Sequence, residues 1–166
     1  MSPGQRHVLT PDASSMRTVL GHYPTGVTIV TAMDGGEPVG LACNSFTSVS
    51  LDPPLVLFCA GKTSSTWPRI QRAGRWAVNV LSEDDEETCR LFAQPGADRF
   101  AHVSYGAGRT GAPLLHDALA FVDCETEAEY DGGDHIIVVG RVVELGYVAE
   151  GRPLCYYRGG YGRFEI

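Results

Sequence analysis

Apolar and polar residues alternate along much of this chain, and the alternation predicts strands rather than long helices. The segment from Thr25 to Met33 is an example, because Val27, Ile29 and their β-branched neighbours follow the two-residue period of a strand. Segments of the same kind recur through the rest of the sequence. The expected strands cover residues 25–33, 38–49, 54–60, 75–81, 118–130, 134–148 and 154–158.

A helix is expected before the first strand. Residues 10–12 place a hydroxyl N-cap before a proline and an acid, which is typical of a helix start. Met16, Val19 and Leu20 then form one apolar stripe, and Gly21 is expected to end the helix.

Two more short helices are expected between strands. Residues 65–72 carry Pro68 in their first turn. Ser82 and Asp85 have the spacing of a capping box, and a Pro-Gly pair at 95–96 is expected to end the helix that follows. The stripe of that helix expected to be buried comprises Cys89, Phe92 and Ala93.

Short, regularly spaced strands with few helices predict a mainly β protein built on a barrel, not a parallel sheet alternating with helices. Gly-rich turns at 34–36 and 131–133 are expected to join neighbouring strands as hairpins, and residues 98–117 to be mostly loop. Residues 1–9 are expected to form a flexible N-terminal tail and residues 10–166 a single domain without internal repeats.

Composition narrows the class of partner. The 166 residues carry a net charge of −7, which argues against nucleic acid or an anionic membrane surface. No apolar run approaches the ~18 residues of a membrane-spanning helix. The five cysteines are odd in number and show no C-x-x-C spacing. We therefore expect reduced thiols, no metal site and a cytoplasmic location.

Two nucleotide-binding motifs are matched in letters but not in context. GAGRTG at 106–111 fits G-x-G-x-x-G, but residues 112–115 show no helical pattern, so a Gly-rich loop is expected. GKT at 61–63 resembles the end of a P-loop, but Val56 stands where that motif needs glycine.

The segment 40–66 contains the strongest candidate for a binding site. It holds two apolar runs around a Pro-Pro turn, and both runs end in small hydroxyl residues. Lys62, the single lysine of the chain, precedes four hydroxyl residues. This cluster suits either a phosphate site or a capped surface turn.

Two segments near the C-terminus are further candidates. His135 follows two glycines at the start of an expected strand, where it is either a structural residue or one that meets a ligand. The aromatic residues of 156–161 surround a glycine pair, and they either stack on a ring or close the end of the barrel.

The chain resembles the short-chain flavin reductases of the FMN-binding split-barrel class, the reductase components of two-component flavin-dependent monooxygenases. The resemblance spans residues 14–164 and rests on an ordered set of motifs. These are PTGVTIVT at 24–31, ACNSFTSVSLDPPLV at 42–56, GKTSST at 61–66, WAVNVL at 76–81, FA at 92–93, DRF at 98–100, GAPLL at 111–115, GDH at 133–135 and YYRGGYGRF at 156–164. Cys43 and Gly61 depart from the usual pattern, which bears on flavin affinity.

The resemblance implies a mainly β fold, a split β-barrel of the Greek-key, FMN-binding type with a few short flanking helices. It implies hydride transfer from NADH to FMN or FAD, and diffusion of the reduced flavin to a partner monooxygenase. NADPH is the less favoured donor, because no arginine pair aimed at a 2′-phosphate is identifiable. A homodimer is expected. Two alternatives remain: an FMN-dependent oxidase of the same fold acting on a small substrate, and a non-catalytic flavin-binding protein.

The resemblance also assigns residues. The flavin is expected to lie along Ala42, Cys43, Asn44, Ser45, Thr47 and Ser48, with its phosphate on Ser64, Ser65 and Thr66. Other expected flavin contacts are Cys59, Lys62, Phe92, Ala93, Arg99 and Phe100. NADH is expected to meet His135, Tyr157, Gly160 and Tyr161. His135 is the candidate catalytic residue, and its expected role is to position the dinucleotide without taking a proton, because hydride transfer needs no base there.

Overall fold

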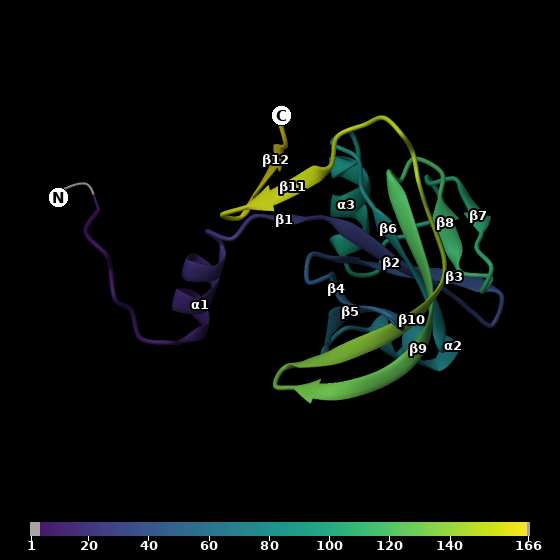
Figure 1. Cartoon of the computed structure of the whole chain (residues 1–166), viewed down its shortest axis with the longest axis horizontal. Coiled ribbons are helices and arrows are strands. Elements are labelled where there is room, and N and C mark those ends of the chain that lie inside the picture. The colour runs from purple at the N-terminus through teal and green to yellow at the C-terminus, as the bar shows by residue number, and fades with distance from the viewer. Residues whose placement is uncertain (1–3, 166) are drawn as a thin grey trace.

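A curved seven-stranded antiparallel sheet forms the body of the protein (Figure 1). The computed structural model describes residues 4–165. The sheet order is β3-β2-β6-β9-β10-β5-β4. These strands are β2 (Thr28–Asp34), β3 (Glu37–Cys43), β4 (Thr47–Leu51), β5 (Pro54–Gly61), β6 (Arg75–Val80), β9 (Ala120–Gly132) and β10 (His135–Tyr147). The predicted mainly β split barrel is confirmed.

Two small sheets flank this body. β1 (Thr25–Gly26), β11 (Leu154–Tyr157) and β12 (Gly160–Arg163) form one of them, and β7 (Tyr105–Ala107) and β8 (Pro113–Leu115) form the other. The chain passes from the first small sheet into the large one at Val27, so the predicted strand 25–33 is two strands. Figure 1 shows β11 and β12 on the side of the molecule opposite β7 and β8.

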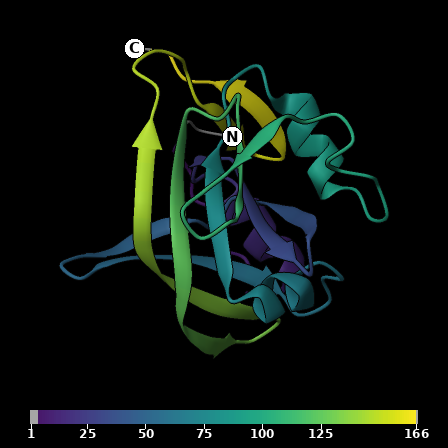
Figure 2. The same cartoon turned by 90° about the vertical axis from the view of Figure 1, so that its right-hand side faces the viewer.

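The three helices of the described residues are short. They are α1 (Ala13–Leu20), α2 (Trp67–Ala73) and α3 (Glu86–Ala93). α2 packs on β2 and β3, and α3 packs on β3 (Figure 2). None of residues 4–165 lies in a helix long and apolar enough to cross a membrane.

α1 stands apart from the sheet, and none of its residues is buried (Figure 1). Its N-cap is Asp12 rather than Thr10, because the Asp12 carboxylate accepts the Ser15 N–H at 2.8 Å. Gly21 ends the helix as predicted. Of the predicted tail 1–9, residues 1–3 lie outside the described residues, and residues 4–9 form no helix or strand.

Aromatic packing fills the interior of the barrel. The Phe58 ring meets two tryptophans edge to face. Its centroid lies 4.8 Å from that of Trp76 and 5.9 Å from that of Trp67. A Cβ added at Gly140 would lie 2.4 Å from the Trp76 ring. The glycine in β10 therefore makes room for the largest fully buried side chain.

Several predicted boundaries were wrong. The expected strand 38–49 is interrupted at 44–46. Residues 98–117 are mostly loop, as predicted, but they also contain the short strands β7 and β8. The expected strand 154–158 is confirmed as β11, and its hairpin partner β12 was not predicted. The third helix begins at Glu86 with Asp85 as its N-cap, so Ser82 lies outside it, although the Asp85 carboxylate accepts the Ser82 N–H at 2.9 Å. Cys89 and Phe92 are buried as predicted, but Ala93, the last residue of the helix, is exposed. The Gly-rich motif at 106–111 is followed by strand β8 and no helix, as predicted.

Candidate active site

Three hollows lie along β3. We call them the central hollow, of about 250 Å³, the tyrosine hollow, of about 180 Å³, and the loop hollow, of about 530 Å³. The central and tyrosine hollows share Ala42, Cys43 and Asn44 as a common wall. The loop hollow continues along β3 through Gly40 and reaches the start of α2. Their arrangement along one strand suits an extended ligand.

The wall shared by two hollows is fixed by Ser45. Its hydroxyl accepts the backbone N–H of Cys59 at 2.9 Å and lies 3.3 Å from the Cys59 carbonyl oxygen. The Ser45 side chain thus binds the backbone of β5 just beyond the point where β4 begins to pair with it, and it holds the segment between β3 and β4 against β5. The Cys43 thiol lies 3.0 Å from the same hydroxyl, and burial raises the pKa of this thiol.

His135 lies at the rim of the central hollow. It is the first residue of β10 and pairs across the sheet with Gly61. Its Nδ1 lies 2.7 Å from Asp134, and this hydrogen bond lowers the pKa of the Asp134 carboxyl. A Cβ added at Gly61 would lie 3.8 Å from Nε2. The hydrogen bond at Nδ1 thus fixes the orientation of the imidazole ring, and Nε2 faces the neighbouring strand β5.

Lys62 is directed elsewhere. Its ammonium group forms an ion pair with Asp131 of β9, which lowers the pKa of that carboxyl. Its backbone N–H donates to the Asp134 carbonyl oxygen at 3.0 Å. Lys62 lines none of the three hollows, so it ties the β9–β10 hairpin to β5.

Two tyrosines from the C-terminal hairpin close the tyrosine hollow. Tyr156 and Tyr161 are directly paired across β11 and β12, with ring centroids 5.4 Å apart. The Tyr161 hydroxyl lies 3.3 Å from the Cys89 sulfur, and Arg90 lies 4.9 Å over the Tyr161 ring. The contact with Cys89 and burial raise the pKa of Tyr161 to about 12, and burial raises that of Cys89. At neutral pH both groups are protonated. α3 therefore holds Tyr161 by a hydrogen bond between two neutral groups, from Cys89, and by a cation–π contact from Arg90.

Arg99 organises the loop hollow. Its guanidinium donates to the Gly40 carbonyl oxygen at 2.6 Å and to the Thr66 hydroxyl at 2.8 Å. Burial lowers the pKa of this guanidinium. Its Nε is buried and has no hydrogen-bond partner among residues 4–165. The positive charge of Arg99 beside the hydroxyl groups of Ser65 and Thr66 suits an anionic ligand such as a phosphate.

The aromatic side of the loop hollow depends on a glycine. Phe100 lines the hollow and meets the buried Phe92 edge to face, with ring centroids 5.1 Å apart. A Cβ added at Gly40 would lie 2.7 Å from the Phe92 ring. Phe92 is therefore a core residue that supports Phe100, and it does not itself line a hollow.

Most of the predicted residues are brought together. The hollows are lined by Ala42, Cys43, Asn44, Ser45, Cys59, Ser64, Ser65, Thr66, Ala93, Arg99, Phe100, His135 and Tyr161. Thr47, Ser48, Lys62, Phe92, Tyr157 and Gly160 do not line them. Thr47 and Ser48 lie exposed on the edge strand β4. The Ser64 hydroxyl also accepts the N–H groups of Thr66 and Trp67, so it caps α2.

Other lining residues were not predicted. Val27, Cys89 and Tyr156 line the tyrosine hollow, and Gly61 lines the central one. The prediction named Tyr157 as the ligand contact in place of Tyr156, but Tyr157 is 46% exposed and does not line a hollow. Neighbouring residues of a strand point to opposite faces, and only the pairing of Tyr156 with Tyr161 reveals which face meets the hollow.

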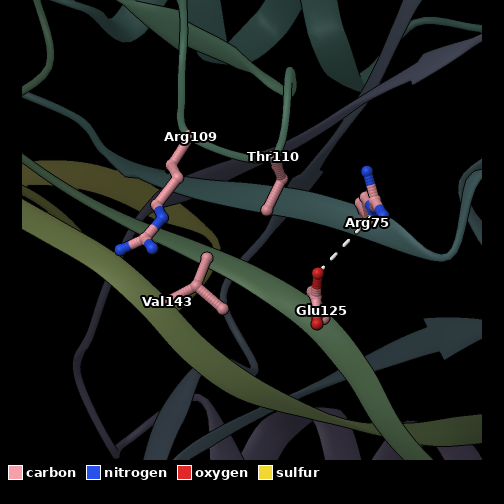
Figure 3. Close-up of a pocket in the computed structure, with 5 residues that line it drawn as sticks. All are labelled: Arg75, Arg109, Thr110, Glu125 and Val143. Atoms are coloured by element: carbon pink, nitrogen blue, oxygen red, sulfur yellow. Dashed lines mark ion pairs between the residues drawn. The ribbon is translucent and has the colours of Figure 1, made fainter.

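A separate pocket of about 410 Å³ lies outside this site, lined by Arg75, Arg109, Thr110, Glu125 and Val143 (Figure 3). Arg75 forms an ion pair with Glu125 at 3.8 Å. Figure 3 shows the Arg109 side chain extending toward Val143 and the Arg75 side chain pointing away from it. The two guanidinium groups do not converge, so this pocket has no built anion site.

Comparison with known proteins points to one family. The model of the flavin reductase like domain matches residues 20–165. The chain is 48% identical over 154 residues to the reductase subunit HsaB of a flavin-dependent monooxygenase from Rhodococcus jostii, covering 93% of this chain and 79% of that protein. It is 46% identical over 154 residues to a flavin reductase of Pseudomonas putida, covering 92% and 91% of the two chains.

A solved structure gives the same picture. The chain matches the NADH:FAD oxidoreductase SgcE6 of Streptomyces globisporus, in complex with NAD and FAD fragments, with a TM-score of 0.91. The sequence identity is 39%, and the match covers 96% of this chain and 98% of that chain. The likeness therefore extends over the hollows described above as well as over the sheet.

Proposed function

We propose, from the premise that this chain belongs to the flavin reductase like domain family, that it is an NADH:flavin oxidoreductase. It transfers a hydride from NADH to FMN or FAD. The similar proteins named as flavin reductases and as an NADH:FAD oxidoreductase support this function. The observation that carries it is the meeting of Arg99 with Ser65 and Thr66 in one hollow, because a cation beside two hydroxyl groups fits the phosphate end of a flavin.

The residues of the chain bind and orient the two nucleotides. Ser65, Thr66 and Arg99 would hold the flavin phosphate, and the wall at Ala42–Asn44 would lie along the flavin ring and ribityl chain. The bound flavin supplies the redox chemistry, because it accepts the hydride. His135 would contact the nicotinamide nucleotide from the rim of the central hollow. None of these residues has to donate or accept a proton for the hydride to move, so orientation is their main contribution.

We further propose that the reduced flavin leaves by diffusion to a partner monooxygenase. HsaB is a reductase subunit of such a monooxygenase, which supports this role. The five free cysteines support a cytoplasmic location. The family match over residues 20–165 supports a single flavin reductase-like domain at 10–166, behind a tail of residues 1–9.

An absorbance assay tests the reaction. Purified protein mixed with FMN or FAD and with NADH or NADPH should remove the NADH absorbance in the presence of free flavin. NADPH should react more slowly, since no arginine pair for a 2′-phosphate is evident in the sequence. An FMN-dependent oxidase or a non-catalytic flavin-binding protein would leave NADH unchanged, and that result would contradict the proposal.

The phosphate site is tested by the double variant Ser65→Ala, Thr66→Ala. Loss of hydroxyl donors should weaken flavin binding roughly tenfold, at about 0.5–1.5 kcal/mol for each hydrogen bond. α2 should stay intact, because its N-cap hydrogen bonds come from Ser64 and not from Thr66. Flavin affinity is measured by fluorescence quenching, with Thr63→Ala as the control in the same segment. A double variant that folds and binds flavin as well as wild type would refute the assignment.

His135 is tested by replacement with alanine. The side chain is 47% exposed and its hydrogen bond is to the adjacent Asp134, so the fold should not depend on it. We expect the KM for NADH to rise, and kcat/KM to fall a few-fold to about tenfold, while flavin affinity stays near wild type. His102→Ala, on an exposed loop, is the control. A lower melting temperature with unchanged NADH kinetics would instead make His135 a structural residue.

We also propose a homodimer. The apolar side chains of α1 are exposed: Met16 by 48%, Val19 by 54% and Leu20 by 58%. An amphipathic helix gains its stability mainly by burying such a stripe, and a second copy of the chain would cover it. Light scattering at micromolar concentration should give twice the mass of one chain, and Val19→Asp with Leu20→Asp should give single chains. A fully active wild-type monomer would contradict the dimer.

A further inference from the structure

The turn between β11 and β12 holds an arginine in an unfavourable backbone conformation. Arg158 has a φ of 50° and Gly159 a φ of 81°, so both central positions of this two-residue turn are left-handed. Turns of this kind favour asparagine or glycine at the first position. A side chain kept at such a position against its backbone preference is often one that a ligand needs.

The Arg158 side chain does not hold the fold together. It is exposed and forms no hydrogen bond or ion pair with any of residues 4–165, while its backbone N–H donates to the Gly21 carbonyl oxygen at 2.9 Å. Two other arginines near the same hairpin form ion pairs with glutamates. Arg90 is paired with Glu86, and the Arg163 guanidinium lies 3.7 Å from Glu83. Arg158 is thus a cation available at the tip of the hairpin.

The position of the β11–β12 turn suits a ligand that has a ring at one end and a charged group at the other. Arg158 lies two residues beyond Tyr156, which closes the tyrosine hollow, so its Cα is roughly 7 Å farther along the hairpin. The tyrosine hollow shares a wall with the central hollow, where His135 lies. A ligand with its ring at this wall and its charged part directed along the hairpin would extend toward Arg158.

We propose that Arg158 binds the pyrophosphate of the nicotinamide dinucleotide, an inference that rests on the proposed function. A guanidinium group matches phosphate oxygens with two parallel N–H donors. The charge also matters at long range, because the chain as a whole is acidic, with a net charge of −7, and repels an anionic dinucleotide. An exposed cation at the tip of the hairpin that closes the tyrosine hollow would offset this repulsion.

The variant Arg158→Asn separates this role from the fold. Asparagine suits the left-handed position, so the melting temperature should equal or exceed that of wild type. With NADH, kcat/KM should fall about tenfold through KM, as expected for a lost charge-assisted contact. With 1-benzyl-1,4-dihydronicotinamide, a hydride donor without phosphate, kcat/KM should not change. Arg158→Lys, which keeps the charge, should recover part of the loss with NADH.

A binding measurement does not depend on the reaction. Calorimetric titration of the flavin-free protein with NAD⁺ should show about tenfold weaker binding to Arg158→Asn than to wild type. Arg109→Asn, which removes the same charge from the β7–β8 loop on the other side of the molecule, should behave as wild type (Figures 1 and 3). Equal losses with both hydride donors, or unchanged NAD⁺ binding, would overturn this inference alone. Failure of wild type to bind NAD⁺ would overturn it together with the proposed function.

Discussion

The hydrogen bonds between the Ser45 hydroxyl and the Cys59 backbone are the constraint on which the site depends. They hold the end of β3 against β5 after the regular ladder of β3 has stopped. The wall at Ala42–Asn44 can then serve two hollows at once, with His135 on one side and Tyr161 on the other.

The fold class could be predicted because alternation of apolar residues reports directly on strands in a sheet with one buried face. The pairing order could not, because β6 and β9 are far apart in the chain and meet only through the closed sheet. The position of β7 and β8 was also missed. Their three-residue strands are too short to show a period, and the loop between them is fixed by the buried Asp123 carboxylate, which accepts the N–H and hydroxyl of Thr110.

The candidate site was predictable where one continuous segment forms it and less so where distant segments meet. Residues 42–45 and 64–66 were found from the hydroxyl clusters and the family resemblance. Cys89 was read as a core residue, because its contact with Tyr161 joins residues far apart in the sequence. Lys62 was read as a flavin contact, and nothing in the sequence reveals its ion pair with Asp131. The position of Arg99 between Gly40 and Thr66 becomes visible only in three dimensions.

The thiols in the walls of the hollows have a consequence for chemical durability. Cys43 and Cys89 are 8% and 3% exposed, and burial raises the pKa of both thiols. Oxidants such as hydrogen peroxide attack the thiolate, and its abundance falls as the pKa rises. Two sulfur atoms can therefore stand beside a redox reaction and remain reduced. The lining gains soft, polarisable contacts for aromatic rings without acquiring a second reactive centre.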